Sequence, residues 1–179
     1  PGIHVLRVMD AVKERIGDYI YGGHEQAAGM TLEVERFEAF REAFREECMK
    51  HDESVFIPKK FYDLELDFTD VSEGFIKSLE FLKPHGEGNN SPVFMAKDVE
   101  IMMIKPLKEG KYGKYTFRQN GMIIQGLMWS DPTEIIATYK QNLRDKTKNV
   151  VDILYVPEIN MWNGEVNLQA RVVDLRFKD

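Results

Sequence analysis

Apolar residues recur at every third or fourth position in three stretches of the first half of the chain. They are Val5, Met9, Val12 and Ile16 in the first stretch, Val34, Phe37, Phe40, Phe44 and Cys48 in the second, and Val71, Phe75, Leu79 and Leu82 in the third. This spacing predicts helices over residues 4–16 and 34–48. Gly17 would cap the end of the first helix, and Thr69 or Asp70 would cap a third helix that runs to about Leu82.

In the second half, apolar and polar residues alternate, as they do in strands with one buried face. Strands are predicted over residues 93–104, 114–119, 122–129, 150–158 and 166–176. Asn120-Gly121 is a two-residue hairpin signal. Asp131-Pro132 opens a helix whose inner side would carry Ile135, Ile136, Tyr139 and Leu143, with proline in the first turn. Five strands with one helix between the third and fourth is the order of an OB-fold barrel.

The two patterns meet at a cluster of Gly, Asn and Pro between Pro84 and Pro92, which is the strongest boundary signal in the chain. Before it, a short strand is expected over residues 31–34 and a strand or linker strand over residues 61–68. We therefore expect an α+β chain: a partial α/β domain over 1–60, a linker strand, helix and loop over 61–91, and a five-stranded OB-fold barrel over 92–179.

Composition excludes several classes of protein. The 179 residues are 43% hydrophobic, enough for packed cores, but no apolar run approaches the roughly 20 residues that a membrane span needs. The first residues lack the basic and apolar regions of a secretory signal and do not begin with Met, so Pro1 is not expected to be the natural start. The single cysteine, Cys48, cannot form an internal disulfide, which favours a reducing cytoplasm.

Charge is distributed unevenly along the chain. The net charge of −6 argues against nucleic-acid binding when taken alone, because phosphate neutralisation requires Lys and Arg. Residues 1–90 carry 11 basic and 19 acidic side chains (−8), whereas residues 91–179 carry 13 basic and 11 acidic ones (+2). The two halves of the chain therefore differ in electrostatic character.

Two glycine-rich segments could contact phosphate. In Gly22-Gly23-His24 the glycines would expose backbone N–H groups and His24 could donate to a phosphate oxygen or stack on a terminal base, although the segment also fits a plain turn. In the loop from Pro84 to Pro92, Gly86, Gly88 and Asn89 could form a phosphate-binding nest, but a hinge between domains is the favoured interpretation.

A third candidate is a basic cluster with aromatic residues, made of Lys105, Lys108, Lys111, Tyr112, Lys114, Tyr115, Phe117 and Arg118. Single-strand binders combine a positive groove with aromatic platforms, and the first strands of an OB-fold often carry that face. By strand parity Tyr115 and Phe117 would point to the core, and Lys114, Thr116 and Arg118 to the opposite face. A solvated hairpin is an equally good interpretation. A second basic group, Lys140, Arg144, Lys146 and Lys148, is expected on the wet side and end of a helix.

No catalytic or metal-binding residue is predicted. The four histidines, His4, His24, His51 and His85, lie far apart and lack neighbours at metal-ligand spacing. Asp63, Glu65 and Asp67 alternate along a predicted strand, which more often means one exposed face than a metal site. A nucleophilic serine elbow and a Cys–His pair are also missing from the sequence.

Taken in order, these segments resemble the C-terminal region of RecJ-type single-stranded-DNA-specific exonucleases. GGHEQAAGMTL is similar to the Gly-Gly-His-x-x-Ala-Ala-Gly element of the DHH-associated domain, and FLKPHGEGNNSPVF resembles the RecJ pattern Pro-Phe-Gly-x-Gly-Asn-Pro-x-Pro-x-Phe. GKYGKYTFRQNGMIIQGLMW and LYVPEINMWNGEVNLQARVVDLR resemble the first and last parts of the RecJ OB-fold. His85 and Asn90 depart from the Phe and Pro that are usual in the second motif.

The resemblance implies a role in DNA repair and recombination. Removal of nucleotides from the 5′ end of single-stranded DNA would use Mn²⁺ or Mg²⁺ held by a DHH domain, which would precede Pro1, so this chain would bind substrate without cutting it. Gly22, Gly23 and His24 would hold the DNA backbone near the scissile phosphate, and the OB-fold would grip the strand further along. Repair or replication proteins are further expected partners. The alternatives are an OB-fold that docks proteins, and a parent phosphodiesterase that acts on short oligonucleotides or dinucleotides.

Overall fold

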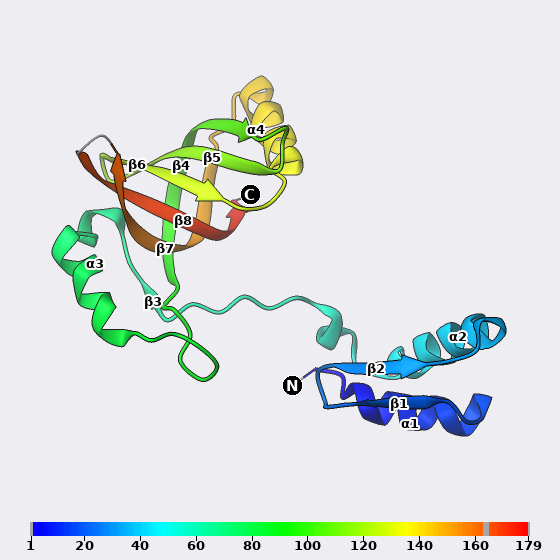
Figure 1. Cartoon of the computed structure of the whole chain (residues 1–179). Coiled ribbons are helices and arrows are strands. Elements are labelled where there is room, and N and C mark those ends of the chain that lie inside the picture. The colour runs from blue at the N-terminus through cyan, green and yellow to red at the C-terminus, as the bar shows by residue number, and fades with distance from the viewer. Residues whose placement is uncertain (1, 163–164, 179) are drawn as a thin grey trace. The chain divides into compact units, whose positions relative to one another are not determined.

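The computed structural model describes residues 2–162 and 165–178, and the chain divides into two compact units, residues 1–60 and 61–179 (Figure 1). The first unit consists of two helices and a hairpin, and the second is a β-barrel with two helices. Among the described helices, none has the length and apolar content to span a membrane.

The first unit packs its two helices against a two-stranded antiparallel hairpin. Helix α1 (Val5–Ile16) is followed by strands β1 (Ile20–Gly23) and β2 (Ala28–Thr31) and by helix α2 (Phe37–Cys48). The core contains Val8, Met9, Val12, Tyr19, Phe40 and Ala43. The guanidinium of Arg36 donates to the carbonyls of Ile16 and Asp18, the latter over 2.7 Å, and so ties the start of α2 to the end of α1.

Two predictions about this unit are wrong. Residues 31–34 do not form the strand: the strands lie earlier and include Gly22 and Gly23. The buried stripe of the second helix does not begin at Val34, which is 85% exposed, and Phe37 is 47% exposed. Residues 34–36 form a 3-10 turn with three residues per turn, which shifts Val34 out of line with Phe40. On the exposed face of α2, Glu38 and Arg41 form an ion pair at 2.7 Å.

The second unit confirms the OB-fold, with its five strands and the helix in the expected order. Strands β4 (Phe94–Leu107), β5 (Tyr112–Gln119), β6 (Met122–Met128), β8 (Glu165–Phe177) and β7 (Val150–Trp162) are neighbours in that order, and β4 also pairs with β7, which closes the barrel. The pairing of β6 with β8 is parallel, and the other pairs within the barrel are antiparallel. The closed barrel leaves no open sheet edge among these five strands.

Helix α4 (Thr133–Asp145) packs Ile135 and Tyr139 against the barrel core, and the Tyr139 hydroxyl donates to the carbonyl of Met102 over 2.9 Å. Two details differ from the prediction. Pro132 is the N-cap residue, one position before the first turn, and the Asp131 carboxylate accepts from the Thr133 N–H over 2.8 Å. Leu143 lies one turn beyond Tyr139 and is 56% exposed, so only the early turns of α4 pack against the barrel.

Residues 61–91 belong to the second unit and are more than a linker. Leu66, Phe68, Val71 and Ile76 are buried in the same core as the barrel strands. The expected strand shrinks to β3 (Leu64–Glu65), which is parallel to β4, because residues 68–70 turn into a 3-10 helix. Helix α3 (Glu73–Leu79) begins later than predicted. Its cap is Ser72, whose hydroxyl accepts from the Phe75 N–H over 3.0 Å, and Leu82 is 48% exposed.

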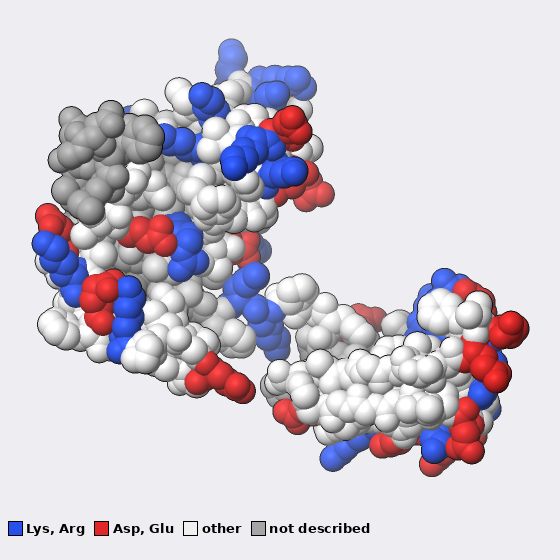
Figure 2. Space-filling model, viewed as in Figure 1, with Lys and Arg blue, Asp and Glu red and all other residues white. Residues whose placement is uncertain are grey.

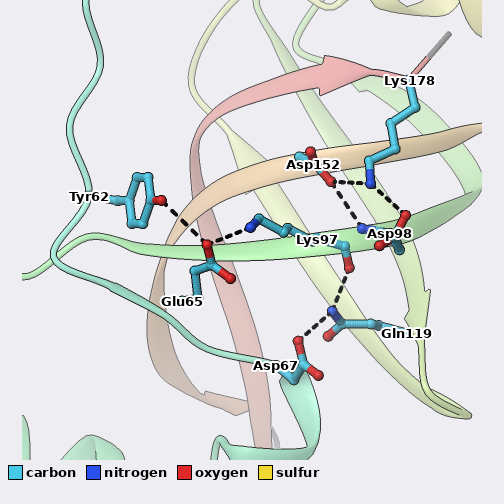
Figure 3. A network of polar contacts seen from close by, with 8 residues as sticks. All are labelled: Tyr62, Glu65, Asp67, Lys97, Asp98, Gln119, Asp152 and Lys178. Atoms are coloured by element: carbon cyan, nitrogen blue, oxygen red, sulfur yellow. Dashed lines mark hydrogen bonds and ion pairs between the residues drawn. The ribbon is translucent and has the colours of Figure 1, made fainter.

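A polar network fastens this segment to the barrel (Figure 3). The Gln119 side chain on β5 is buried: it accepts from the Phe68 N–H over 2.8 Å and donates to the Lys97 carbonyl over 2.7 Å and to Asp67 over 2.9 Å. Glu65 forms an ion pair with Lys97. At the β-bulge of β4, the Asp98 N–H donates to Asp152 and its carboxylate pairs with Lys178. The network therefore gives Glu65 and Asp67, two of the three alternating acids of the predicted strand, a structural role.

Candidate nucleic-acid interface

The outer face of β4 and β5, together with the turn between them, carries the basic cluster found in the sequence. Tyr115 and Phe117 are fully buried, as their parity predicted, and their rings stack at a centroid distance of 5.4 Å. The intervening residues of β5 therefore point outward, and Lys114 and Arg118 are exposed. Figure 2 shows basic side chains grouped over the end of the barrel that carries α4.

Lys105 on β4 and Lys114 on β5 are register partners, so their side chains lie side by side on the same face of the sheet. Like charges in this arrangement repel, at a cost of a few tenths of a kcal/mol up to about 1 kcal/mol. Within the described residues no carboxylate lies within ion-pair distance of either lysine, whereas Lys97, Arg118, Arg171 and Lys178 of the same unit each have an acidic partner. The face thus keeps two uncompensated positive charges side by side.

Arg118, which was predicted to share this role, has a carboxylate partner. Its Nε donates to Glu100 on β4 over 2.9 Å, and a second guanidinium nitrogen also contacts that oxygen. These two contacts to one carboxylate oxygen of Glu100 offset the charge of Arg118. Arg118 is therefore a weaker candidate for binding phosphate than Lys105 or Lys114.

An aromatic pair lies at the end of the same face. Tyr112 opens β5 opposite Leu107, and its ring centroid is 4.8 Å from that of Trp129, which follows β6. Trp129 is 62% exposed, and the Lys108 ammonium lies 6.0 Å from the Tyr112 ring centroid. Sequence reasoning missed Trp129, although the strand pattern over 122–129 could have placed it on the outer side. Exposed aromatic rings beside lysines can stack with nucleobases.

The connection between β4 and β5 supplies the other lysines of the cluster. Lys108, Glu109 and Gly110 have positive φ, which makes a tight turn, and Lys108 and Lys111 are exposed on either side of Glu109. This connection joins the first two strands of the barrel, where OB-folds often contact ligands.

Gly22-Gly23-His24 lies in the first unit, at the end of β1 and in the turn to β2. Gly23 is required by the hairpin itself: its φ is +151°, and an added Cβ would lie 2.3 Å from the Ala27 carbonyl oxygen. Gly22 is different, because an added Cβ would meet nothing within 4 Å, and the same is true of its register partner Gly29. These two glycines leave a flat stretch of exposed backbone, and Figure 2 shows uncharged residues over β1 and β2.

His24 is exposed, and its ring is partly held by the turn. Its Nδ1 accepts from the Gln26 N–H over 3.3 Å, and its backbone N–H donates to the Ala27 carbonyl over 2.9 Å. Because Nδ1 accepts a hydrogen bond, the neutral imidazole carries its proton on the other ring nitrogen, Nε2. Nε2 is then the atom that can donate to a phosphate oxygen.

The loop with Gly86, Gly88 and Asn89 uses much of its hydrogen-bonding capacity internally. Gly86 and Asn89 exchange two backbone hydrogen bonds, and the Asn89 side-chain amide donates to the carbonyls of Leu82 and Pro84, each over 2.9 Å. Gly88 has a φ of +79°, which the turn requires. These contacts favour a structural loop over a phosphate-binding nest.

The acids considered as metal ligands are engaged elsewhere: Glu65 with Lys97, Asp67 with the amides of Gln119 and Asn120, and Asp63 with the Val93 N–H. Among residues 2–162 and 165–178, no three His, Cys, Asp or Glu side chains gather in a way that could hold a metal ion. The barrel thus brings together Lys105, Lys108, Lys111 and Lys114, whereas the glycine–histidine turn belongs to the first unit.

Comparisons with known proteins agree with this architecture. The family model described as the RecJ OB domain matches residues 62–174. The single-stranded-DNA-specific exonuclease RecJ of Thermus thermophilus is 27% identical over 156 residues, which is 87% of this chain and 21% of that protein. The chain therefore spans about a fifth of that relative.

Two crystal structures of the Thermus thermophilus RecJ, in complex with Mn²⁺ and with Mg²⁺, each superpose with a TM-score of 0.67. Their sequence identities are 24% and 23%, and they cover 100% and 99% of this chain but 24% and 26% of their own. At this identity they establish the shared fold.

Proposed function

Because the chain belongs to the RecJ OB domain family, we propose that it is the strand-holding part of a single-stranded-DNA-specific exonuclease. The substrate of the intact enzyme would be a single DNA strand, degraded from its 5′ end during repair and recombination. Repair or replication proteins in the cytoplasm would be its partners.

The observation that carries this proposal is the Lys105–Lys114 pair beside the Tyr112–Trp129 pair. Two uncompensated lysines in register cost stability, and a phosphate placed between them would remove the repulsion. The neighbouring rings offer π-faces at which bases can stack, whatever their sequence. A positive track with an aromatic platform is the arrangement that single-strand binders use, and the outer strands of an OB-fold are a common place for it.

The β1–β2 hairpin would make a second contact. Gly22 and Gly29 leave the backbone without side chains at positions where the hairpin does not itself need glycine. A DNA backbone could therefore approach closely, and His24 could donate to a phosphate oxygen. We assign hydrolysis, and the Mn²⁺ or Mg²⁺ that it would use, to a DHH domain. The described residues of this chain do not form a metal centre, and no step of hydrolysis is assigned to them.

The test is binding of a fluorescein-labelled single-stranded dodecamer, measured by anisotropy at several salt concentrations. We expect micromolar or weaker, salt-sensitive binding. Lys114→Glu and Trp129→Ala should each weaken it at least about tenfold, in keeping with about 1–3 kcal/mol for one stacked base. Lys140→Glu, on the exposed side of α4, is the matched control and should change affinity by less than about threefold. Salt-independent binding, or equal effects of Lys114→Glu and Lys140→Glu, would contradict the proposal.

A second candidate is a protein-docking role for the same face, favoured by two exposed apolar side chains. Met103 is 60% exposed and Ile123 is 53% exposed on the outer face. If single-stranded DNA leaves the backbone amide NMR signals of residues 105–129 unmoved while a repair or replication protein shifts them, docking would replace strand binding as the function.

A further inference from the structure

A groove of about 560 Å³ runs beside the lysine pair, on the outer side of the barrel. Its walls come from β5, β6, β7 and β8, and its polar residues are Lys114, Gln125, Asn160, Asn167 and Gln169. The volume lies in the range of small-molecule sites. None of the described residues that line it is glutamate or aspartate, although the chain has 30 acidic residues and a net charge of −6.

The four carboxamides are brought together by strand register. Gln125 and Gln169 are partners across the parallel pair β6–β8, and Asn160 and Asn167 are partners across the antiparallel pair β7–β8. In the described part of the chain, one side-chain hydrogen bond engages these amides: the Thr116 hydroxyl donates to Oε1 of Gln125 over 3.4 Å. That contact orients Gln125 so that its NH₂ remains available to a ligand.

We infer that this groove binds a nucleobase by its hydrogen-bonding edge, and that the barrel therefore discriminates between bases. The inference rests on the proposed function, because the strand must first lie on the lysine face. A carboxamide offers a donor and an acceptor side by side, which matches the donor–acceptor edges of unpaired bases. Lys114 lines both the groove and the lysine pair, so a phosphate held there would bring its own base to the amides.

Edge recognition and stacking have different consequences. Stacking at Tyr112 and Trp129 would make any oligonucleotide with bases bind more tightly than an abasic one, since every base has a π-face. Contacts from Gln125 and Gln169 would favour some bases over others, because the edges differ in their donors and acceptors. Because stacking strength alone gives modest preferences, a preference among homopolymers reports on the groove only where removal of the groove amides abolishes it.

The experiment compares dT12, dC12 and dA12 with a dodecamer of abasic residues, using the whole chain. Wild type should bind the best homopolymer about tenfold more tightly than the worst, the size of one good bidentate contact. The Gln125→Leu/Gln169→Leu double variant should bring that ratio below about twofold while it keeps salt-sensitive binding. Gln141→Leu, which removes an amide from α4 that donates to Asp145, should keep the wild-type ratio.

An NMR measurement on wild type makes the test independent of how well the double variant folds. The side-chain NH₂ signals of Gln125 and Gln169 should shift with the preferred homopolymer and stay in place with the abasic dodecamer. Equal affinities for the three homopolymers, unmoved NH₂ signals, or a preference that survives the double substitution would each overturn the inference and leave the proposed function standing. If wild type binds none of the oligonucleotides, both the inference and the proposed function are wrong.

Discussion

Lys105 on β4 and Lys114 on β5 stand directly opposite each other, with no carboxylate within ion-pair distance of either in the described part of the chain. The chain has more acidic than basic residues, so a counter-charge could readily have been placed here. Arg118, a few residues along the same strand, has one in Glu100. The contrast within a single strand supports the proposed phosphate contact at the pair.

Lys105→Met and Lys114→Met should each raise stability while they weaken DNA binding. Removing either charge relieves the same repulsion, so each variant should gain about 0.5 kcal/mol in urea unfolding, and the double variant should gain no more than either single one. The slope of log affinity against log salt should fall by about 0.7–1 for each lysine lost from a phosphate contact.

Lys140→Met on α4 is the control for both measurements and should leave the salt slope unchanged. Additive gains in stability would mean that the two lysines do not repel each other, and an unchanged salt slope in Lys114→Met would mean that it touches no phosphate.

The adjacent glycines Gly22 and Gly23 should respond oppositely to alanine. Gly23→Ala should destabilise the first unit by more than about 1 kcal/mol, because the added Cβ would meet the Ala27 carbonyl at 2.3 Å and the φ of +151° disfavours a side chain. Gly22→Ala should be neutral or stabilising by up to about 1 kcal/mol, since alanine lowers the entropy of the unfolded chain and meets nothing.

Urea unfolding followed by circular dichroism measures both effects. If the bare backbone at Gly22 serves DNA, Gly22→Ala should also weaken dodecamer binding despite its intact fold. Equal stabilities of the two variants would contradict the account of the hairpin.

Two buried tyrosines of the barrel, Tyr115 and Tyr155, differ in whether their hydroxyl groups have a hydrogen-bond partner. The Tyr155 hydroxyl donates to the Leu66 carbonyl over 3.0 Å, whereas the buried Tyr115 hydroxyl has no hydrogen-bond partner among the described residues. Tyr155→Phe should therefore lower the free energy of unfolding by about 1–2 kcal/mol, and Tyr115→Phe should leave it unchanged or raise it by about 1 kcal/mol.

Burial also raises the pKa of Tyr115 to about 12 from its ordinary value near 10. In alkali the unfolded chain loses this proton before the folded one, so stability falls as the pH rises from about 10 toward about 12. Tyr115→Phe should make that fall shallower, as measured by urea unfolding at several pH values. An unchanged slope would show that Tyr115 does not stay protonated in the barrel.

Much of the fold follows from local patterns. Alternation along each segment was enough to predict five strands and to put Tyr115 and Phe117 inside, because strand parity needs only neighbouring residues. The ends of the buried side of each helix were harder to predict. Val34 and Leu143 have apolar side chains at helical spacing, yet both are exposed, since the extent of a helix's packing depends on elements far away in the sequence.

By itself the sequence determined the order of the strands and the helix of the barrel, the basic character of the second half, and the motifs that resemble RecJ, because each lies within a short run of residues. Tertiary structure alone decided which residues meet. It set Lys105 against Lys114, gave Arg118 a partner in Glu100, and gathered Gln125, Asn160, Asn167 and Gln169 around one groove. Such meetings depend on the register of strands up to dozens of residues apart, which is fixed only when the barrel closes.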